Sequence, residues 1–257
     1  MSLTFYKYQG TGNDFIIIDN RTKKFPKNNI NAITKLCNRH FGIGADGLIL
    51  IENHDTTDFR MLYFNADGSE TMCGNGGRCA VAFAKKLNII ETKTTFTAFD
   101  GEHYAEINNG IVSLHMIDVN EIKITNEYIF ANTGTQHHVQ LVDDLTNFPV
   151  FEKGKNIRNN IYGVQGSNVN FVEQLNANTF RVRTYEKGVE NETLACGTGV
   201  TAVAIAMHAT KKTTNTLINL PVEGGLLAVS FDEKNGNYTN IFLKGPAVLV
   251  FKGEIEL

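Results

Sequence analysis

Two cysteines in this chain begin similar short motifs. Cys73 starts the run Cys-Gly-Asn-Gly and Cys196 starts Cys-Gly-Thr-Gly, and each run continues into small apolar residues that predict a buried helix. Each thiol is therefore expected at a helix N-terminus, where unpaired backbone N–H groups and the helix dipole bind anions and lower a thiol pKa. Two such motifs indicate a site with two facing thiols that handle one proton from opposite sides.

Other interpretations of the two motifs fit less well. A single Cys-Gly-x-Gly is usually a tight strand-to-helix turn around a buried cysteine, but the second copy favours function. Neither motif ends in the Gly-Lys-Ser/Thr of a phosphate-binding loop. No acidic residue stands at the end of a second parallel strand, as a dinucleotide-binding unit requires.

Polar residues near turns and strand ends supply further candidates. Each asparagine alone is an ordinary turn residue, and each charged side chain alone is an ordinary surface group. Several amides together would suit a polar, zwitterionic ligand. These candidates are Asn13, Asn65, Asn168, His137, Glu186 and Lys187.

Composition limits the class of protein. The 257 residues are 42% hydrophobic and 20% charged, with a net charge of −3, which gives no basic footprint for nucleic acid. No apolar run is long enough to span a bilayer and no signal peptide is visible, so we expect a cytoplasmic protein. The four cysteines are expected as free thiols. Their spacing does not fit a zinc site, because there is no Cys-x-x-Cys and His137 and His138 are adjacent. No metal is expected.

The elements that must position these residues are mostly strands. Helices are predicted over 29–38, 74–87 and 197–209, and the last two, apolar on nearly all faces, predict helices wrapped by sheet. Asn109-Gly110 predicts a two-residue hairpin, and the first residues predict an edge strand. The pattern indicates an α/β (α+β) fold of two similar halves, 1–118 and 119–245, with a last strand over 246–257 that returns to the first half.

Five separated motifs, in order along the chain, closely resemble those of diaminopimelate epimerase. The resemblance runs from about residue 5 to Gly245-Pro246-Ala247. The motifs are Gly10 to Phe15, Arg39 to Gly47, Asn65 to Ser69, Met72 to Arg78 and Glu192 to Gly199.

The resemblance implies two pseudo-symmetric halves, each a curled mixed sheet around a central helix, with the active site between them. It implies interconversion of LL- and meso-diaminopimelate, in lysine and peptidoglycan-precursor biosynthesis, without pyridoxal phosphate, other cofactors or metal. One cysteine would remove the α-proton as thiolate and the other would deliver a proton as thiol. Backbone N–H groups of Gly74-Asn75 and Gly197-Thr198 would hold the α-carboxylate. A homodimer is also implied.

Residue roles carried over from the resemblance follow position by position. His137 and Glu186 would be the polar partners of Cys73 and Cys196, respectively. Asn13, Asn65 and Asn168 would bind substrate. Lys187 stands where the family normally has the arginine that resembles a clamp for the distal carboxylate, and lysine keeps the charge but loses the two-point fork. Gln136 and Thr135 also depart from the family pattern.

Three rival functions share part of the pattern. A related racemase without pyridoxal phosphate, acting on a monocarboxylic amino acid, is supported by Lys187. An isomerase of the phenazine-biosynthesis type has a carboxylate in place of the first cysteine, so Cys73 argues against it. A binding protein for a dicarboxylic amino acid would leave the two thiols unexplained. Cys37 and Cys79 are expected to be structural.

Overall fold

The computed structural model describes residues 2–256, which form two compact units. The first unit runs to Leu114 and resumes at Gly245, and the second runs from His115 to Lys244. Within the described residues no helix is long and apolar enough to cross a membrane.

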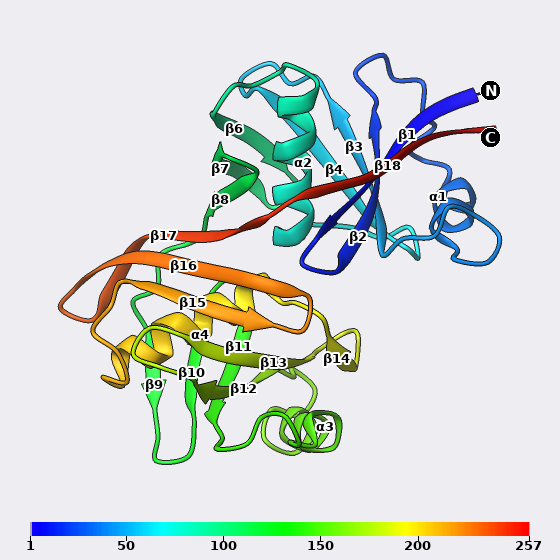
Figure 1. Cartoon of the computed structure of the whole chain (residues 1–257). Coiled ribbons are helices and arrows are strands. Elements are labelled where there is room, and N and C mark those ends of the chain that lie inside the picture. The colour runs from blue at the N-terminus through cyan, green and yellow to red at the C-terminus, as the bar shows by residue number, and fades with distance from the viewer. Residues whose placement is uncertain (1, 257) are drawn as a thin grey trace. The chain divides into compact units, whose positions relative to one another are not determined.

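The first unit is a mixed sheet that curls around one helix. Its elements are β1 (Ser2–Gly10), β2 (Asn13–Asp19), α1 (Ile30–Cys37), β3 (Gly47–Glu52), β4 (Phe59–Asn65), β5 (Glu70–Thr71), α2 (Gly74–Lys86), β6 (Lys93–Ala98), β7 (Gly101–Asn108), β8 (Ile111–His115) and β18 (Val248–Glu256). The strand order is β8-β7-β6-β4-β3-β2-β1-β18, with β5 paired to β4. Helix α2 packs against β1, β2, β3, β4 and β7 (Figure 1).

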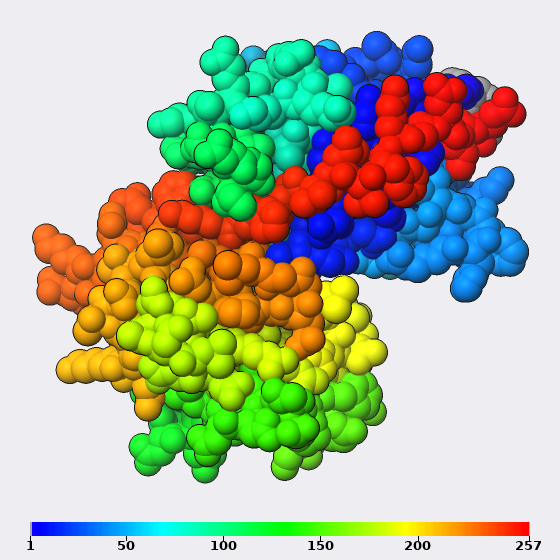
Figure 2. All heavy atoms as spheres, viewed as in Figure 1, coloured from blue at the N-terminus to red at the C-terminus, as the bar shows by residue number. Residues whose placement is uncertain are grey.

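The prediction of an edge strand at the N-terminus is wrong. Strand β1 pairs with β2 on one side and antiparallel with β18 on the other, so the chain's last strand forms the edge. In Figure 2 the red C-terminal residues lie along the dark-blue N-terminal residues. The alternation of buried and exposed residues in β1 fixes its faces but carries no information about how many neighbours it has.

The second unit contains two sheets with a helix between them. Its elements are β9 (Ile122–Ile124), β10 (Ile129–Asn132), β11 (Gln136–Leu141), α3 (Val150–Asn160), β12 (Asn168–Gln174), β13 (Phe180–Glu186), β14 (Asn191–Thr193), α4 (Gly197–Ala209), β15 (Leu217–Val222), β16 (Gly225–Lys234) and β17 (Asn237–Pro246). One sheet has the order β14-β13-β12-β11-β10-β9, and β15, β16 and β17 form an antiparallel set.

Helix α4 explains the apolar run after Cys196. It contacts β10 to β13 on one side and β15 and β16 on the other, so apolar side chains are buried all around it. The predicted mixed α+β architecture, with a central helix in each half, is confirmed. The hairpin at Asn109-Gly110 is confirmed too, because both residues have positive φ, at 50° and 78°.

Helix α3 was not predicted from the sequence. Its stretch is polar, and Gly154 in its middle disfavours a helix. In the structure Gly154 lies against β13, where a Cβ atom would come within 2.3 Å of the Cβ of Tyr185. Close packing of this helix on Tyr185 therefore requires glycine and offsets its low helix propensity.

Candidate active site

Both predicted cysteines are N-cap residues of buried helices. Cys73 precedes α2 with φ −134° and ψ 121°, and Cys196 precedes α4 with φ −122° and ψ 110°. Neither sulfur caps its helix within the described residues, and neither first turn contains an acidic residue. The predicted placement at helix N-termini is confirmed, and the first-turn N–H groups of each helix are suited to an anion.

In the first unit, the Asn13 amide lies beside the first cysteine. Its Oδ1 accepts hydrogen bonds from the Cys73 thiol at 3.4 Å and from Asn75 Nδ2 at 3.2 Å. Its Nδ2 donates to Asp46 Oδ2 at 2.6 Å. Three candidates, Asn13, Cys73 and Asn75, are thus brought together where the β1–β2 turn meets the start of α2.

Two carboxylates and two cations hold this turn in place. Asp14 forms ion pairs with Lys7 at 2.6 Å and with Arg39 at 2.7 Å, and Arg39 also pairs with Asp46 at 2.8 Å. Burial opposes ionisation of Asp14, but hydrogen bonds from Arg39 and Lys7 outweigh it and lower its pKa to about 2. The cluster is charge-balanced, so it positions Asn13 without adding net charge.

In the second unit, His137 is fully buried at 0% exposure. One ring nitrogen, Nδ1, lies 3.1 Å from Asn170 Nδ2, and the other, Nε2, lies 2.9 Å from Thr135 Oγ1. Thr135 Oγ1 is 3.1 Å from Thr198 Oγ1, which is 3.6 Å from the sulfur of Cys196. A continuous chain of polar groups therefore joins His137 to the second cysteine. The expected pairing of His137 with Cys73 stays a prediction.

Burial decides the charge of this histidine. It lowers the pKa of His137 to about 3, so the imidazole is neutral at physiological pH. A neutral imidazole has one donor and one acceptor nitrogen, and its hydrogen-bond partners decide which is which.

Glu186, the second predicted acid/base partner, ends β13. Its Oε2 accepts a hydrogen bond from Thr193 Oγ1 at 3.0 Å. Burial raises the pKa of Glu186, and the Thr193 hydrogen bond lowers it in part. Direct contact of Glu186 with Cys196 stays a prediction.

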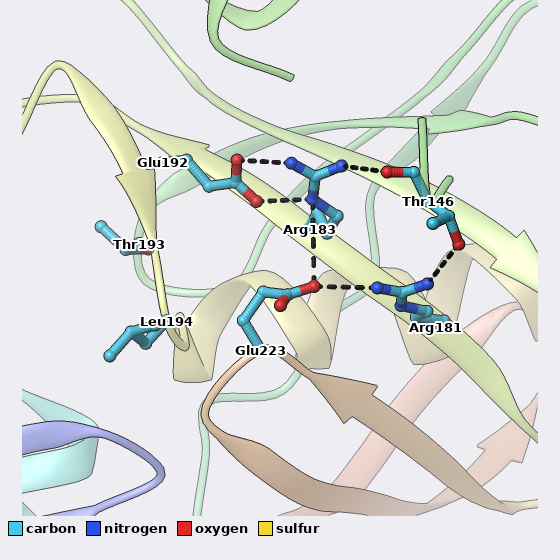
Figure 3. Close-up of a pocket in the computed structure, with 7 residues that line it drawn as sticks. All are labelled: Thr146, Arg181, Arg183, Glu192, Thr193, Leu194 and Glu223. Atoms are coloured by element: carbon cyan, nitrogen blue, oxygen red, sulfur yellow. Dashed lines mark hydrogen bonds and ion pairs between the residues drawn. The ribbon is translucent and has the colours of Figure 1, made fainter. Parts of the chain in front are cut away.

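A charged clamp fixes the segment between Glu186 and Cys196. Arg183 holds Glu192 with two hydrogen bonds of 2.6 and 2.8 Å, and it donates to three backbone carbonyls, those of Leu145, Thr146 and Phe148. Arg181 pairs with Glu223 at 3.0 Å. These side chains line a pocket of about 420 Å³ (Figure 3). Both arginines are already paired with groups of this same chain. The clamp is therefore suited to hold β14, which leads to Cys196.

The remaining candidates lie at strand ends. Asn168 begins β12, is 7% exposed, and accepts a hydrogen bond from the backbone N–H of Lys187 at 2.8 Å. The Lys187 side chain is exposed, and none of the ion pairs between described residues involves it. Asn65 ends β4 and donates to Ser69 Oγ at 3.0 Å. Neither of these two hydrogen bonds places Asn65 or Lys187 beside Cys73 or Cys196.

The second glycine of the Cys196 motif is required by packing. A Cβ atom at Gly199 would lie 2.5 Å from Asn170 Oδ1 and 3.2 Å from the sulfur of Cys196. The backbone of α4 therefore approaches both the buried amide and the thiol because residue 199 has no side chain.

Sequence reasoning missed three residues that bond to the candidates. Asp46 accepts from Asn13, Arg78 Nη1 donates to Asn75 Oδ1 at 3.1 Å, and Asn170 lies beside His137. Asp46 and Arg78 lie inside motifs on which the resemblance rests, but nothing about an aspartate or an arginine at these positions indicated a role in the site. Asn170 had a visible signal, because it is a polar residue inside an apolar strand and shares a sheet face with Asn168.

Comparisons with known proteins find relatives that match nearly the whole chain. The family model described as "Diaminopimelate epimerase" matches residues 5–114 and 129–250. The diaminopimelate epimerase of Flavobacterium psychrophilum is 60% identical over 98% of this chain and 100% of its own length. That of Chlorobaculum tepidum is 42% identical over 96% of this chain and 99% of its own.

Solved structures show the same fold at low identity. A PhzF-family phenazine biosynthesis protein from Bacillus anthracis superposes with a TM-score of 0.79 at 13% identity, covering both chains fully. A probable proline racemase from Agrobacterium radiobacter gives a TM-score of 0.71 at 13% identity, over 99% of this chain and 93% of that one. With near-full-length sequence relatives and one shared fold, this chain belongs to the diaminopimelate epimerase family of isomerases.

Proposed function

We propose that this chain interconverts LL- and meso-diaminopimelate, in the synthesis of lysine and of peptidoglycan precursors, by proton transfer through Cys73 and Cys196. The observation that carries the mechanism is that both thiols are N-cap residues of buried helices with nearly the same backbone geometry. One thiolate removes the α-proton and the other thiol supplies a proton to the opposite face. We further propose two domains, a cytoplasmic location and a homodimer.

Stabilisation of the carbanion is the main demand of this reaction, because the α-proton is very weakly acidic. Negative charge develops on the α-carboxylate as the proton leaves. The first-turn N–H groups, at Gly74-Asn75 and Gly197-Thr198, are fixed donors for that charge, and fixed donors need no reorganisation during the reaction. Asn13 and Asn168 supply amides within the same two networks.

Solvent deuterium incorporation tests this function. Incubation in deuterium oxide with LL-diaminopimelate is expected to give meso product that carries deuterium at the inverted α-carbon. A panel of monocarboxylic amino acids is the comparison, because the rival racemase would exchange one of them faster. Binding of diaminopimelate without any exchange would show a binding protein and contradict the proposal.

Lys187 is expected to bind the distal carboxylate of diaminopimelate. It is an exposed cation whose backbone is fixed by Asn168. Lys187→Ala is expected to raise KM for diaminopimelate by roughly ten- to a hundredfold, the value of one charge-assisted hydrogen bond. Lys187→Arg should keep or lower KM. Steady-state kinetics with both stereoisomers measures this.

The matched control is Lys155→Ala, which removes an exposed lysine from α3 in the same unit and should leave KM unchanged. An unchanged KM in Lys187→Ala, or a monocarboxylic amino acid as the better substrate of the wild type, would favour the broader racemase function.

Thr193→Val is expected to shift the pH dependence of turnover. The Thr193 hydroxyl stabilises the ionised form of Glu186, so its loss leaves burial unopposed and raises the pKa of Glu186 further. The acidic limb of the kcat/KM profile should move to higher pH by roughly half a unit to one unit. Thr179→Val, at the start of the same hairpin, is the control. A profile that does not move would mean that Glu186 does not act in its ionised form.

A further inference from the structure

We infer that Arg78 is a positioning residue of the candidate active site, and that its buried cation holds the reacting carboxylate of the substrate at the start of α2. Three features of Arg78 carry the inference: its guanidinium is completely buried, it is hydrogen-bonded to neutral groups, and it lies beside the positive end of a helix. The inference rests on the proposed function, which brings an amino-acid carboxylate to this helix, and it adds the charge that holds the carboxylate there.

Arg78 differs from the other buried lysine and glutamate side chains of the described residues. Lys7, 7% exposed, pairs with Asp14, and Glu52, 5% exposed, pairs with Lys27. Arg78 is 0% exposed, and none of the ion pairs between described residues includes it. A buried ion without an opposite charge loses its hydration and gains no compensating attraction, so Arg78 by itself is costly to the folded chain.

The hydrogen bonds of Arg78 satisfy its N–H groups without balancing its charge. Nη1 donates to Asn75 Oδ1 at 3.1 Å and Nη2 donates to Thr11 Oγ1 at 2.9 Å, and both acceptors are neutral. Nε has no hydrogen-bond partner among the described residues. Gly10 allows the β1–β2 turn to approach this closely, because a Cβ atom there would lie 3.3 Å from Nη2.

The position of Arg78 along α2 adds to this cost. Arg78 is the fifth residue of a helix that begins at Gly74, and its hydrogen bond to the second residue, Asn75, places the guanidinium beside the first turn. That turn is the positive end of the helix dipole, and it contains no acidic residue. The guanidinium and the dipole therefore repel each other, and together they concentrate positive potential at the start of α2.

Two thiols are the acidic groups whose charge acts on Arg78, those of Cys79 and Cys73. Burial raises the pKa of Cys79 to about 12, so this thiol is neutral near pH 7 and does not balance the cation. A Cys73 thiolate would compete with substrate for the role of counter-ion. A carboxylate at the start of α2 balances both the guanidinium and the dipole, and the proposed substrate carries one on its reacting carbon.

The Asn75 amide links Arg78 to the rest of the site. Because a guanidinium only donates, the end of Asn75 that faces Arg78 is the oxygen, and the nitrogen end faces Asn13 Oδ1 at 3.2 Å. Asn13 lies in turn beside Cys73. Arg78 therefore supplies the charge and also fixes the direction of the Asn75 amide, which belongs to a residue proposed to hold the carboxylate.

Binding of diaminopimelate to the full chain tests the inference. All variants are made in a Cys73→Ala parent, which lacks the competing thiolate, and calorimetry measures the affinity. Arg78→Met removes the charge and is expected to weaken binding at least about tenfold. Arg78→Lys keeps the charge without the two-point fork and should retain most of the affinity. Arg60→Met, which removes an exposed arginine from β4 of the same unit, is the matched control and should bind as the parent does.

The urea unfolding midpoint without substrate distinguishes a charge kept for the substrate from a charge kept for the fold. Arg78→Met removes the buried ion and its conflict with the dipole, but it leaves Asn75 and Thr11 without a donor. Its midpoint should therefore lie close to that of the parent or above it. Arg183→Met is the comparison, because Arg183 holds Glu192 through two hydrogen bonds, and its midpoint should fall.

Equal affinity in Arg78→Met and the parent would overturn the inference. Equal weakening by Arg78→Met and Arg78→Lys would also overturn it, because hydrogen-bond geometry and not charge would then be what matters. A fall in the midpoint of Arg78→Met as large as that of Arg183→Met would show a structural role and would overturn it too. Failure of the proposed function is a different result, because it would appear as absence of binding, or of deuterium exchange, in the chain with both cysteines intact.

Discussion

Replacing either Cys73 or Cys196 with alanine is expected to lower epimerisation by roughly three powers of ten or more, because under the proposed mechanism each variant lacks one of the two groups that give or take the α-proton. Both cysteines are N-caps whose sulfur atoms do not cap the helix within the described residues, so the helices should persist. Turnover in both directions, with circular dichroism as the folding check, measures the effect.

The remaining two cysteines provide matched controls. Cys37 and Cys79 are buried, and burial raises their pKa values to about 11 and about 12, so both are neutral thiols near pH 7. Their alanine variants should keep kcat while losing about 1 kcal/mol of unfolding free energy to the cavity. Near-normal turnover in Cys196→Ala would show that a single cysteine, or another group, transfers both protons.

The contrast between these cysteines shows what sequence could predict. The motif Cys-Gly-x-Gly before an apolar run combines a local turn signal with a helix signal, and both are properties of adjacent residues. Sequence therefore located Cys73 and Cys196 at helix N-termini and placed Cys79 inside α2. The mixed α+β class followed in the same way from strand-length apolar runs and two strongly apolar helices.

Pairing between distant residues was not predictable to the same degree. Strand β1 looked like an edge strand because nothing in the sequence showed that the last strand, β18, pairs with it in particular. Helix α3 was missed because it depends on the packing of Gly154 on Tyr185, and no local sequence pattern indicates that contact. Long-range packing overrides local propensity in both cases.

The same contrast between local sequence signals and long-range contacts holds for the candidate site. Asn13, Asn75 and Thr198 stand within or beside recognisable motifs and were predicted as candidates. Asp46 and Asn170 were not, because their importance lies in the direction of the hydrogen bonds they give or accept. That property depends on which group faces which, and only coordinates supply it.

The second large effect is expected on stability in acid. Burial lowers the pKa of His137 to about 3 and that of His138 to about 4, whereas an unfolded histidine titrates near 6.5. Between these values the unfolded chain binds more protons than the folded one. The stabilisation is therefore complete above about pH 6.5 and is lost as the pH falls. At pH 5 each histidine should cost on the order of 2 kcal/mol of unfolding free energy.

Urea unfolding at pH 7.5 and pH 5 measures this loss, and His138→Phe is the variant that isolates it. His138 stacks on Tyr128 with ring centroids 4.4 Å apart, and a phenyl ring can keep that contact without binding a proton. The variant should lose about half of the pH-dependent destabilisation, whereas replacement of the exposed His40 by glutamine should leave it intact. If His138→Phe showed the same drop as the wild type, His138 would not be a source of the acid sensitivity. Asp14 would not explain such a drop, because its pKa of about 2 keeps it ionised and its ion pairs formed at pH 5.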